Sequence, residues 1–172
     1  GRMPVLFDVR ESANVARALA IGKEFSLKMI VLGSGLEVAE AGAIAALKEA
    51  GVPVILPLAY PEKPKVEDAD EALNVSLRDL ERWDLAPTNP SELQRAGIPI
   101  ALGTCRLPTA GDFPARLRKA IGRGLSAQAA LAALTTAPAK MTGVEETMGT
   151  IEPGKIANLA LFEEAPADGE MI

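Results

Sequence analysis

Residues 49–56 read EAGVPVIL, and residues 95–102 repeat the same pattern as RAGIPIAL. In each copy the glycine suits the left-handed conformation that ends a helix, and the proline suits the first residue of a strand. Each copy therefore predicts a helix that passes directly into a strand, as in an array of βαβ units. The repeat indicates an α/β fold and carries no information about chemistry.

Four short apolar runs predict the strands of this fold. They are Val5–Phe7, Met29–Leu32, Val54–Leu56 and Ile100–Leu102. Each run is apolar throughout instead of alternating, which is typical of parallel strands that are buried on both faces. We therefore expect four parallel strands.

Helical patterns lie between and after these strands. Ser12 is expected to cap the first helix, and Asn89 is expected to cap a short helix with Pro90 as its first residue. Leucines at positions 73, 77 and 80 have helical spacing and predict another helix. The other predicted elements are helices over 37–50, 112–121, 126–135 and 136–141, and a final strand over 156–162.

The composition excludes several classes of function. The chain has 172 residues, a formal net charge of −5 and 3% aromatic residues, so we expect no nucleic-acid partner. No apolar run reaches the roughly 18 residues of a membrane span, so no membrane association is expected. The first residues show no signal-peptide pattern and pass almost at once into a predicted strand, so no signal peptide is expected. The sequence has no histidine, which removes the usual metal ligand and general base. The single cysteine leaves the compartment open.

Polar residues follow the predicted strands, at the edge where α/β proteins bind ligands. The Asp8 carboxylate can act as a general base or metal ligand, or it can cap the next helix and pair with Arg10. The Gly33–Ser34–Gly35 turn offers backbone N–H groups that can hold an anion. It can also be a plain tight turn, since Val38 stands at the third glycine position of a dinucleotide fingerprint.

Cys105 and Arg106 follow the fourth strand. A thiolate at position 105 can act as a nucleophile or ligand, but only Arg106 and a helix dipole are available to lower its pKa. The alternative is an inert, buried cysteine.

A separate acidic group is interpreted as the solvated start of a helix and not as a metal site. It comprises Glu67, Asp68, Asp70 and Glu71.

An ordered block of short motifs occupies the C-terminal part of the chain. It runs GRGLS at 122–126, AALAALT at 129–135, PA at 138–139, glycine at 143 and GTIEPGKIANL at 149–159. This block resembles the C-terminal signature of the amidohydrolase superfamily, and more narrowly that of its imidazolonepropionase-like branch. Residues 96–104 are similar to that family's last barrel strand, and residues 4–7 are similar to its fifth strand.

The resemblance implies part of a (β/α)8 TIM barrel. Residues 1–148 are expected to form the C-terminal half of such a barrel, and residues 149–172 a strand of a small flanking β-sandwich and a tail. Active relatives use zinc-activated water to hydrolyse C–N bonds in small-molecule substrates such as cyclic amides or peptide-like compounds. An incomplete barrel leaves sheet edges and apolar faces uncovered. We therefore expect self-association or pairing with a missing N-terminal half.

The metal ligands that the resemblance implies are replaced in this sequence. Asp8 stands at the position of the histidine of strand five, and Leu32 or Gly33 at that of strand six. Cys105 replaces the aspartate of strand eight. We therefore expect no bound metal, no cofactor and no hydrolase activity of this chain by itself.

Residual chemistry would depend on a few residues at the strand ends. Asp8 is the candidate acid or base, Cys105 the candidate ligand or nucleophile, and Arg10 and Arg106 the candidate clamp for an anionic group. Gly33, Ser34 and Gly35 complete the predicted substrate-binding set. Two alternatives stay open: a non-catalytic binding or interaction module, and a small α/β domain that binds a phosphorylated ligand at residues 33–35.

Overall fold

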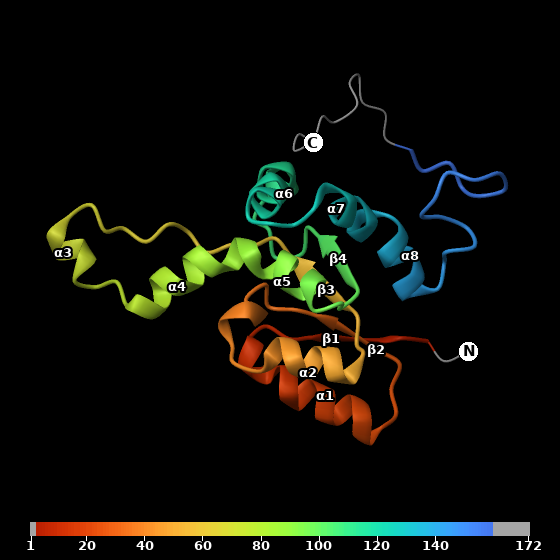
Figure 1. The fold of residues 1–172 in the computed structure, drawn as a ribbon, viewed down its shortest axis with the longest axis horizontal. Helices are drawn as coiled ribbons and strands as arrows, with labels where there is room; N and C mark the ends of the chain where they lie inside the picture. The colour runs from red at the N-terminus through yellow and green to blue at the C-terminus, as the bar shows by residue number, and fades with distance from the viewer. Residues whose placement is uncertain (1–2, 160–172) are drawn as a thin grey trace.

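The computed structural model describes residues 3–159, and these form one four-stranded sheet. Its strands are β1 (Val5–Asp8), β2 (Met29–Leu32), β3 (Val54–Pro57) and β4 (Ile100–Gly103). They are parallel and lie in the order β1-β2-β3-β4 (Figure 1). The four strands predicted from the apolar runs are therefore confirmed.

The described residues form eight α-helices, and α3 lies on a segment that extends away from the sheet (Figure 1). They are α1 (Val15–Glu24), α2 (Ala43–Ala50), α3 (Ala69–Ala72), α4 (Leu77–Leu85), α5 (Asn89–Arg95), α6 (Phe113–Gly122), α7 (Ala127–Leu134) and α8 (Thr136–Thr142). Four short 3-10 turns complete the set: Ser12–Asn14, Glu37–Ala39, Ala86–Thr88 and Ala110–Asp112. None of the helices within residues 3–159 is long and apolar enough to cross a membrane.

The strand register gives the sheet two different faces. Val31 pairs with Val54 and Leu56 pairs with Leu102, so alternate residues of neighbouring strands share a face. That face carries the main core, together with fully buried Leu47 of α2, Leu93 of α5 and Leu117 of α6. Burying each such leucine stabilises the fold by about 1.5–3 kcal/mol. The helices are therefore held mainly through this one face.

The opposite face of the sheet has a smaller apolar cluster. Ile30, Ile55 and Ala101 lie there, and α8 covers them with Ala137 and Met141. The predicted helices over 112–121, 126–135 and 136–141 are confirmed as α6, α7 and α8.

Both copies of the repeated junction form the same hydrogen-bonded helix end. Gly51 has φ +62° and Gly97 has φ +79°, which are left-handed values that favour glycine. Val52 N–H donates to the Leu47 carbonyl at 3.4 Å, and Ile98 N–H donates to the Leu93 carbonyl at 3.1 Å. This six-to-one bond is the mark of a Schellman motif. The predicted passage from helix to strand is confirmed at both places.

The helix predicted over 37–50 is wrong at its start. Residues Glu37–Ala39 form a 3-10 turn, and α2 begins only at Ala43. Gly42 between them has φ +83°, which a continuous right-handed helix does not allow. The Ser12 cap is also wrong, because Ser12 lies buried in a 3-10 turn and α1 begins after Asn14 without a side-chain cap.

The helix predicted from leucines 73, 77 and 80 is divided in two. Ser76 caps α4 by accepting from Asp79 N–H at 3.2 Å, so the chain restarts there. Leu73 and Leu77 are exposed and do not form a core face. Asn89 does not cap α5, because α5 begins at Asn89 itself. The Asn89 side chain instead forms hydrogen bonds with Glu37 and Val38.

The first and last predicted strands also depart from expectation. Val5 and Leu6 of β1 are 40% and 54% exposed, whereas β4, the other edge strand of the sheet, is largely buried. In the predicted final strand, residues 156–159 are not extended in a sheet, and residues 160–162 lie outside the described residues. The proposed division between residues 148 and 149 stays a prediction.

Candidate functional site

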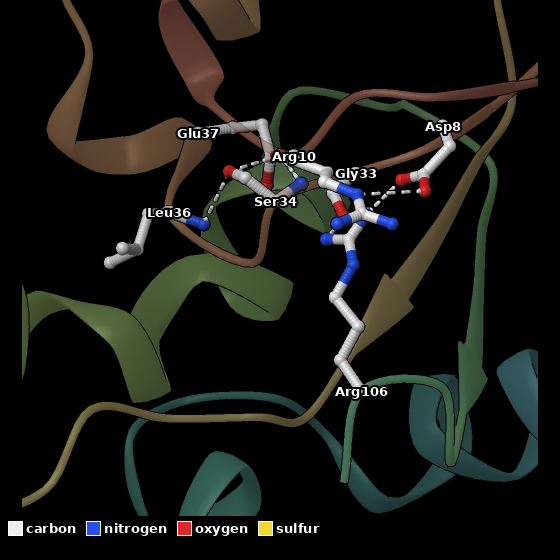
Figure 2. A network of polar contacts seen from close by, with 7 residues as sticks. All are labelled: Asp8, Arg10, Gly33, Ser34, Leu36, Glu37 and Arg106. Atoms are coloured by element: carbon white, nitrogen blue, oxygen red, sulfur yellow. Dashed lines mark hydrogen bonds and ion pairs between the residues drawn. The ribbon is translucent and has the colours of Figure 1, made fainter.

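The carboxyl ends of three strands meet through one arginine (Figure 2). Asp8 is the last residue of β1, Gly33 follows β2, and Arg106 comes three residues after β4. The Arg106 guanidinium donates from Nη2 to Asp8 Oδ1 and from Nη1 to the Gly33 carbonyl oxygen at 2.7 Å. The structure therefore brings together two of the predicted site residues, Asp8 and Arg106, which are 98 positions apart in the chain.

The Asp8 carboxylate has a guanidinium partner on each oxygen. Arg10 Nε donates to Oδ2 at 3.3 Å, while Arg106 contacts Oδ1. Desolvation alone would raise the pKa of Asp8, but the hydrogen bonds and positive charges of Arg106 and then Arg10 outweigh it, so this pKa lies below its usual value of 3.8. Asp8 is therefore held ionised and is a weak base at neutral pH.

The turn that carries Arg106 has an unusual backbone. Leu107 N–H donates to the Thr104 carbonyl at 3.0 Å and closes a four-residue turn. Arg106 has φ +65°, in the region that glycine favours at the third position of such a turn. An arginine in this conformation is retained when its surroundings over-determine it, and the two side-chain bonds of Arg106 meet that condition.

The loop after β2 is organised by a buried carboxylate that sequence reasoning did not single out. Glu37 is fully buried and accepts from Ser34 N–H at 2.5 Å and from Ser34 Oγ at 2.8 Å. Its other oxygen accepts from Asn89 Nδ2 at 2.7 Å, and Asn89 Oδ1 accepts from Val38 N–H at 2.8 Å. The network joins this loop to the start of α5. The spacing Ser34-x-x-Glu37 is that of a capping box and could have identified the pair.

The Gly33–Ser34–Gly35 turn is packed from both sides. A Cβ atom at position 33 would lie 2.8 Å from Glu37 Oε1 and 3.1 Å from Val54 Cγ1. Gly35 has φ +86° and lies against the Pro57 carbonyl. The Ser34 N–H, which could have held a phosphate, already donates to the Glu37 carboxylate. This geometry favours the tight-turn interpretation over an anion site.

Cys105 lies half-buried beside this network. Burial raises the pKa of the thiol, and the positive charge of Arg106 offsets only part of that rise. The thiol is therefore protonated at neutral pH, which disfavours both nucleophile and ligand roles.

The residues present do not fit the metal that the resemblance implies. Within residues 3–159, no three Asp, Glu or Cys side chains lie close enough to hold an ion. Both Asp8 oxygens are engaged by guanidinium groups, and position 33 has neither a side chain nor room for one. In the separate acidic group, Asp68 accepts from the N–H groups of Asp70 and Glu71 and caps α3, as predicted for a helix start.

Comparison with protein families decides the relationship of this chain. The model of the amidohydrolase family matches residues 84–170, which is just over half of the chain. The chain belongs to the amidohydrolase family. The resemblance predicted from the C-terminal motifs is thus confirmed at the level of the family, whereas the imidazolonepropionase-like branch stays a prediction.

Solved structures share the fold of this amidohydrolase-family chain. An amidohydrolase from Thermotoga maritima matches 90% of this chain and 36% of its own, at 24% identity and TM-score 0.68. A second amidohydrolase matches 91% of this chain and 37% of its own, at 22% identity and TM-score 0.59. A Xaa-Pro dipeptidase with bound methionine in its active site matches 86% and 41%, at 18% identity and TM-score 0.53. None of the curated proteins matches the chain.

These likenesses establish the fold at the level of architecture. The amidohydrolase-family chain has the α/β architecture of a partial TIM-barrel-like fold, as expected from its sequence. It spans between 36% and 41% of the length of these three solved structures.

Proposed function

We propose that this chain is a metal-free, non-hydrolytic part of an amidohydrolase-family protein. The resemblance to the family implies hydrolysis of C–N bonds in cyclic amides or peptide-like substrates by metal-activated water. The observation that carries the proposal is the tie from Arg106 to Asp8 and Gly33, which lies at the strand ends where a metal centre would have to be built.

The chemistry of metal-assisted hydrolysis supports this proposal. A catalytic zinc site needs about three protein ligands and an open position for water. Of the three positions that the resemblance assigns, Asp8 is paired with two cations, Leu32 or Gly33 offers no side-chain ligand, and Cys105 is a protonated thiol. Any C–N hydrolysis by a longer protein that contains this chain would need ligands from outside the described residues.

A second candidate is a binding module for a small anionic molecule. Two guanidinium groups face one carboxylate here, which leaves one positive charge without an acidic partner in the trio. Arg10 is exposed, and its bond to Asp8 is 3.3 Å long, so it can turn toward a carboxylate or phosphate from solvent. In this candidate the contacts of Arg106 with Asp8 and with the Gly33 carbonyl stay intact.

Elemental analysis of the purified chain tests the first candidate. The protein is produced with added zinc and manganese, and turnover is assayed with cyclic amides and dipeptides. We expect far less than about one metal ion per chain and no turnover. About one metal ion per chain, lost in Asp8→Ala or Cys105→Ser, would overturn the proposal.

The second candidate predicts weak binding of acetate or phosphate that Arg10→Ala abolishes, measured by calorimetry.

A further inference from the structure

The Arg106 side chain spans the carboxyl ends of the sheet from the turn after β4 (Figure 2). It meets a carboxylate oxygen of Asp8 on one side and the carbonyl oxygen of Gly33 on the other. Its side chain is only 27% exposed, so the contacts are partly shielded from solvent. Because guanidinium donors stand in a rigid planar fork, the two oxygens are held at a fixed separation.

The oxygen acceptors are themselves held in place. Gly33 precedes Ser34, whose N–H and hydroxyl groups both donate to buried Glu37. Glu37 is in turn fixed by Asn89 at the start of α5. The Gly33 carbonyl is therefore presented by a rigid loop, and Asp8 is presented by the last residue of a strand. An acidic oxygen and a carbonyl oxygen aimed at one point are the kind of ligand set that a cation takes.

We propose that the Arg106 guanidinium is the resident cation of this site and takes the structural place of a metal ion. It ties the ends of β1 and β2 to the turn after β4. The left-handed φ of Arg106 is the backbone conformation that delivers the side chain to this place. The inference rests on the proposed function, because a metal ion at the same point would compete with Arg106 for Asp8.

The inference predicts a cation-binding site when the side chain is removed. Arg106→Gly deletes the guanidinium but also relieves the strain of the left-handed φ, so its loss of stability is a lower limit for the contribution of the side chain. Arg106→Ala deletes the same guanidinium and keeps a side chain at the strained position. The oxygens of Asp8 and Gly33 should then accept a free guanidinium-type cation. Methylguanidinium is the probe, and sodium chloride at the same millimolar concentration is its ionic-strength control.

Thermal unfolding of the full chain, followed by circular dichroism, provides the test. Arg106→Gly should lower the Tm by about 3 °C or more, and methylguanidinium should restore a large part of that loss. Arg10→Ala is the matched control: it also removes a guanidinium from Asp8 but leaves Gly33 untouched, and it should shift the Tm by less than about 1 °C. In Asp8→Asn/Arg106→Gly the rescue should disappear.

Three results would overturn the inference. They are Tm values of Arg106→Gly and Arg106→Ala that both equal that of the wild type, equal effects of methylguanidinium and sodium chloride on Arg106→Gly, and additive effects of Asp8→Asn and Arg106→Gly in a double-mutant cycle. If Arg106→Gly does not fold, Arg106→Lys replaces it, because it keeps the charge and loses the fork. Asp8→Asn should then cost less in the Lys variant than in the wild type, and an equal cost overturns the inference.

The two proposals can fail separately. Metal content of the wild-type chain decides the proposed function, whereas the Asp8–Arg106 coupling and the rescue decide the role of Arg106. A metal-free protein in which the two substitutions are additive would leave the proposed function standing without this inference. A wild-type chain with about one bound metal ion would remove the proposed function itself.

Discussion

At the scale of single residues, two contacts of Asp8 control the charge of the strand-end site. Arg106 and Arg10 hold its pKa below the usual value against the effect of desolvation. A carboxyl group whose pKa is lower in the folded chain than in the unfolded chain stabilises the fold above its unfolded pKa. That stabilisation is lost as the pH falls through the folded pKa.

The first prediction follows from the lowered pKa of Asp8 in the folded chain. Asp8→Asn should lower the Tm at neutral pH. The difference from the wild type should shrink as the pH falls below about 4, because the Asp8 carboxyl is then protonated in the unfolded chain before it is protonated in the folded chain. Thermal melts of both proteins from neutral to acid pH measure the difference. A gap that stays constant over the whole range would show that the ionised carboxylate is not what stabilises the fold.

The close packing around Gly33 supports a second prediction. Gly33→Ala places a methyl group against Glu37 Oε1 and Val54 and should lower the free energy of unfolding by about 1–3 kcal/mol. Gly122→Ala is the control, since a Cβ at that position, the last of α6, meets nothing within 4 Å. It should be neutral or slightly stabilising. Urea unfolding measures both variants, and equal losses would refute the packing argument.

At the scale of elements, the two Schellman motifs connect helix to strand in the same way. A Cβ at Gly97 meets nothing within 4 Å, so the cost of a side chain there comes from its left-handed backbone alone. The motif therefore determines where α5 ends and where β4 can begin.

Gly97→Ala should lower the free energy of unfolding by about 1–2 kcal/mol, and Gly97→Asn by less, because asparagine tolerates the left-handed region. Urea unfolding of the two variants gives the comparison. If alanine and asparagine cost the same, the loss does not arise from the backbone conformation of residue 97.

Local sequence signals were sufficient for some elements and failed for others. The Schellman glycines act through hydrogen bonds between residues close in the chain, so the sequence predicts them. The first residues of the predicted helix over 37–50 form a separate 3-10 turn, in which the Glu37 carboxylate accepts from Asn89, 52 positions away. Helical spacing carries no information about such a partner.

At the scale of the whole molecule, β1 is the exposed element of the sheet. It is an edge strand, and Met3, Val5 and Leu6 expose apolar surface beside its unpaired backbone edge. An edge of this kind can pair with another chain. We therefore propose that β1 mediates self-association with a second copy of this chain.

Leu6→Lys should reduce the average mass of the purified chain in light scattering and weaken the binding of a hydrophobic dye. Leu77→Lys is the matched control, because Leu77 is also exposed but lies on α4, away from β1. A wild-type chain that is a monodisperse monomer without dye binding would contradict the proposal.

The sequence by itself determined the α/β class, the four strands, the two helix-to-strand junctions and the family relationship. These depend on apolar runs, on glycine conformation and on hydrogen bonds between residues close in the chain. Only the tertiary structure decided that Arg106 meets Asp8 and Gly33, that Glu37 is buried with Asn89, and that β1 is exposed. Those outcomes depend on which distant segments pack together, and residue spacing along the chain does not record distances across the fold.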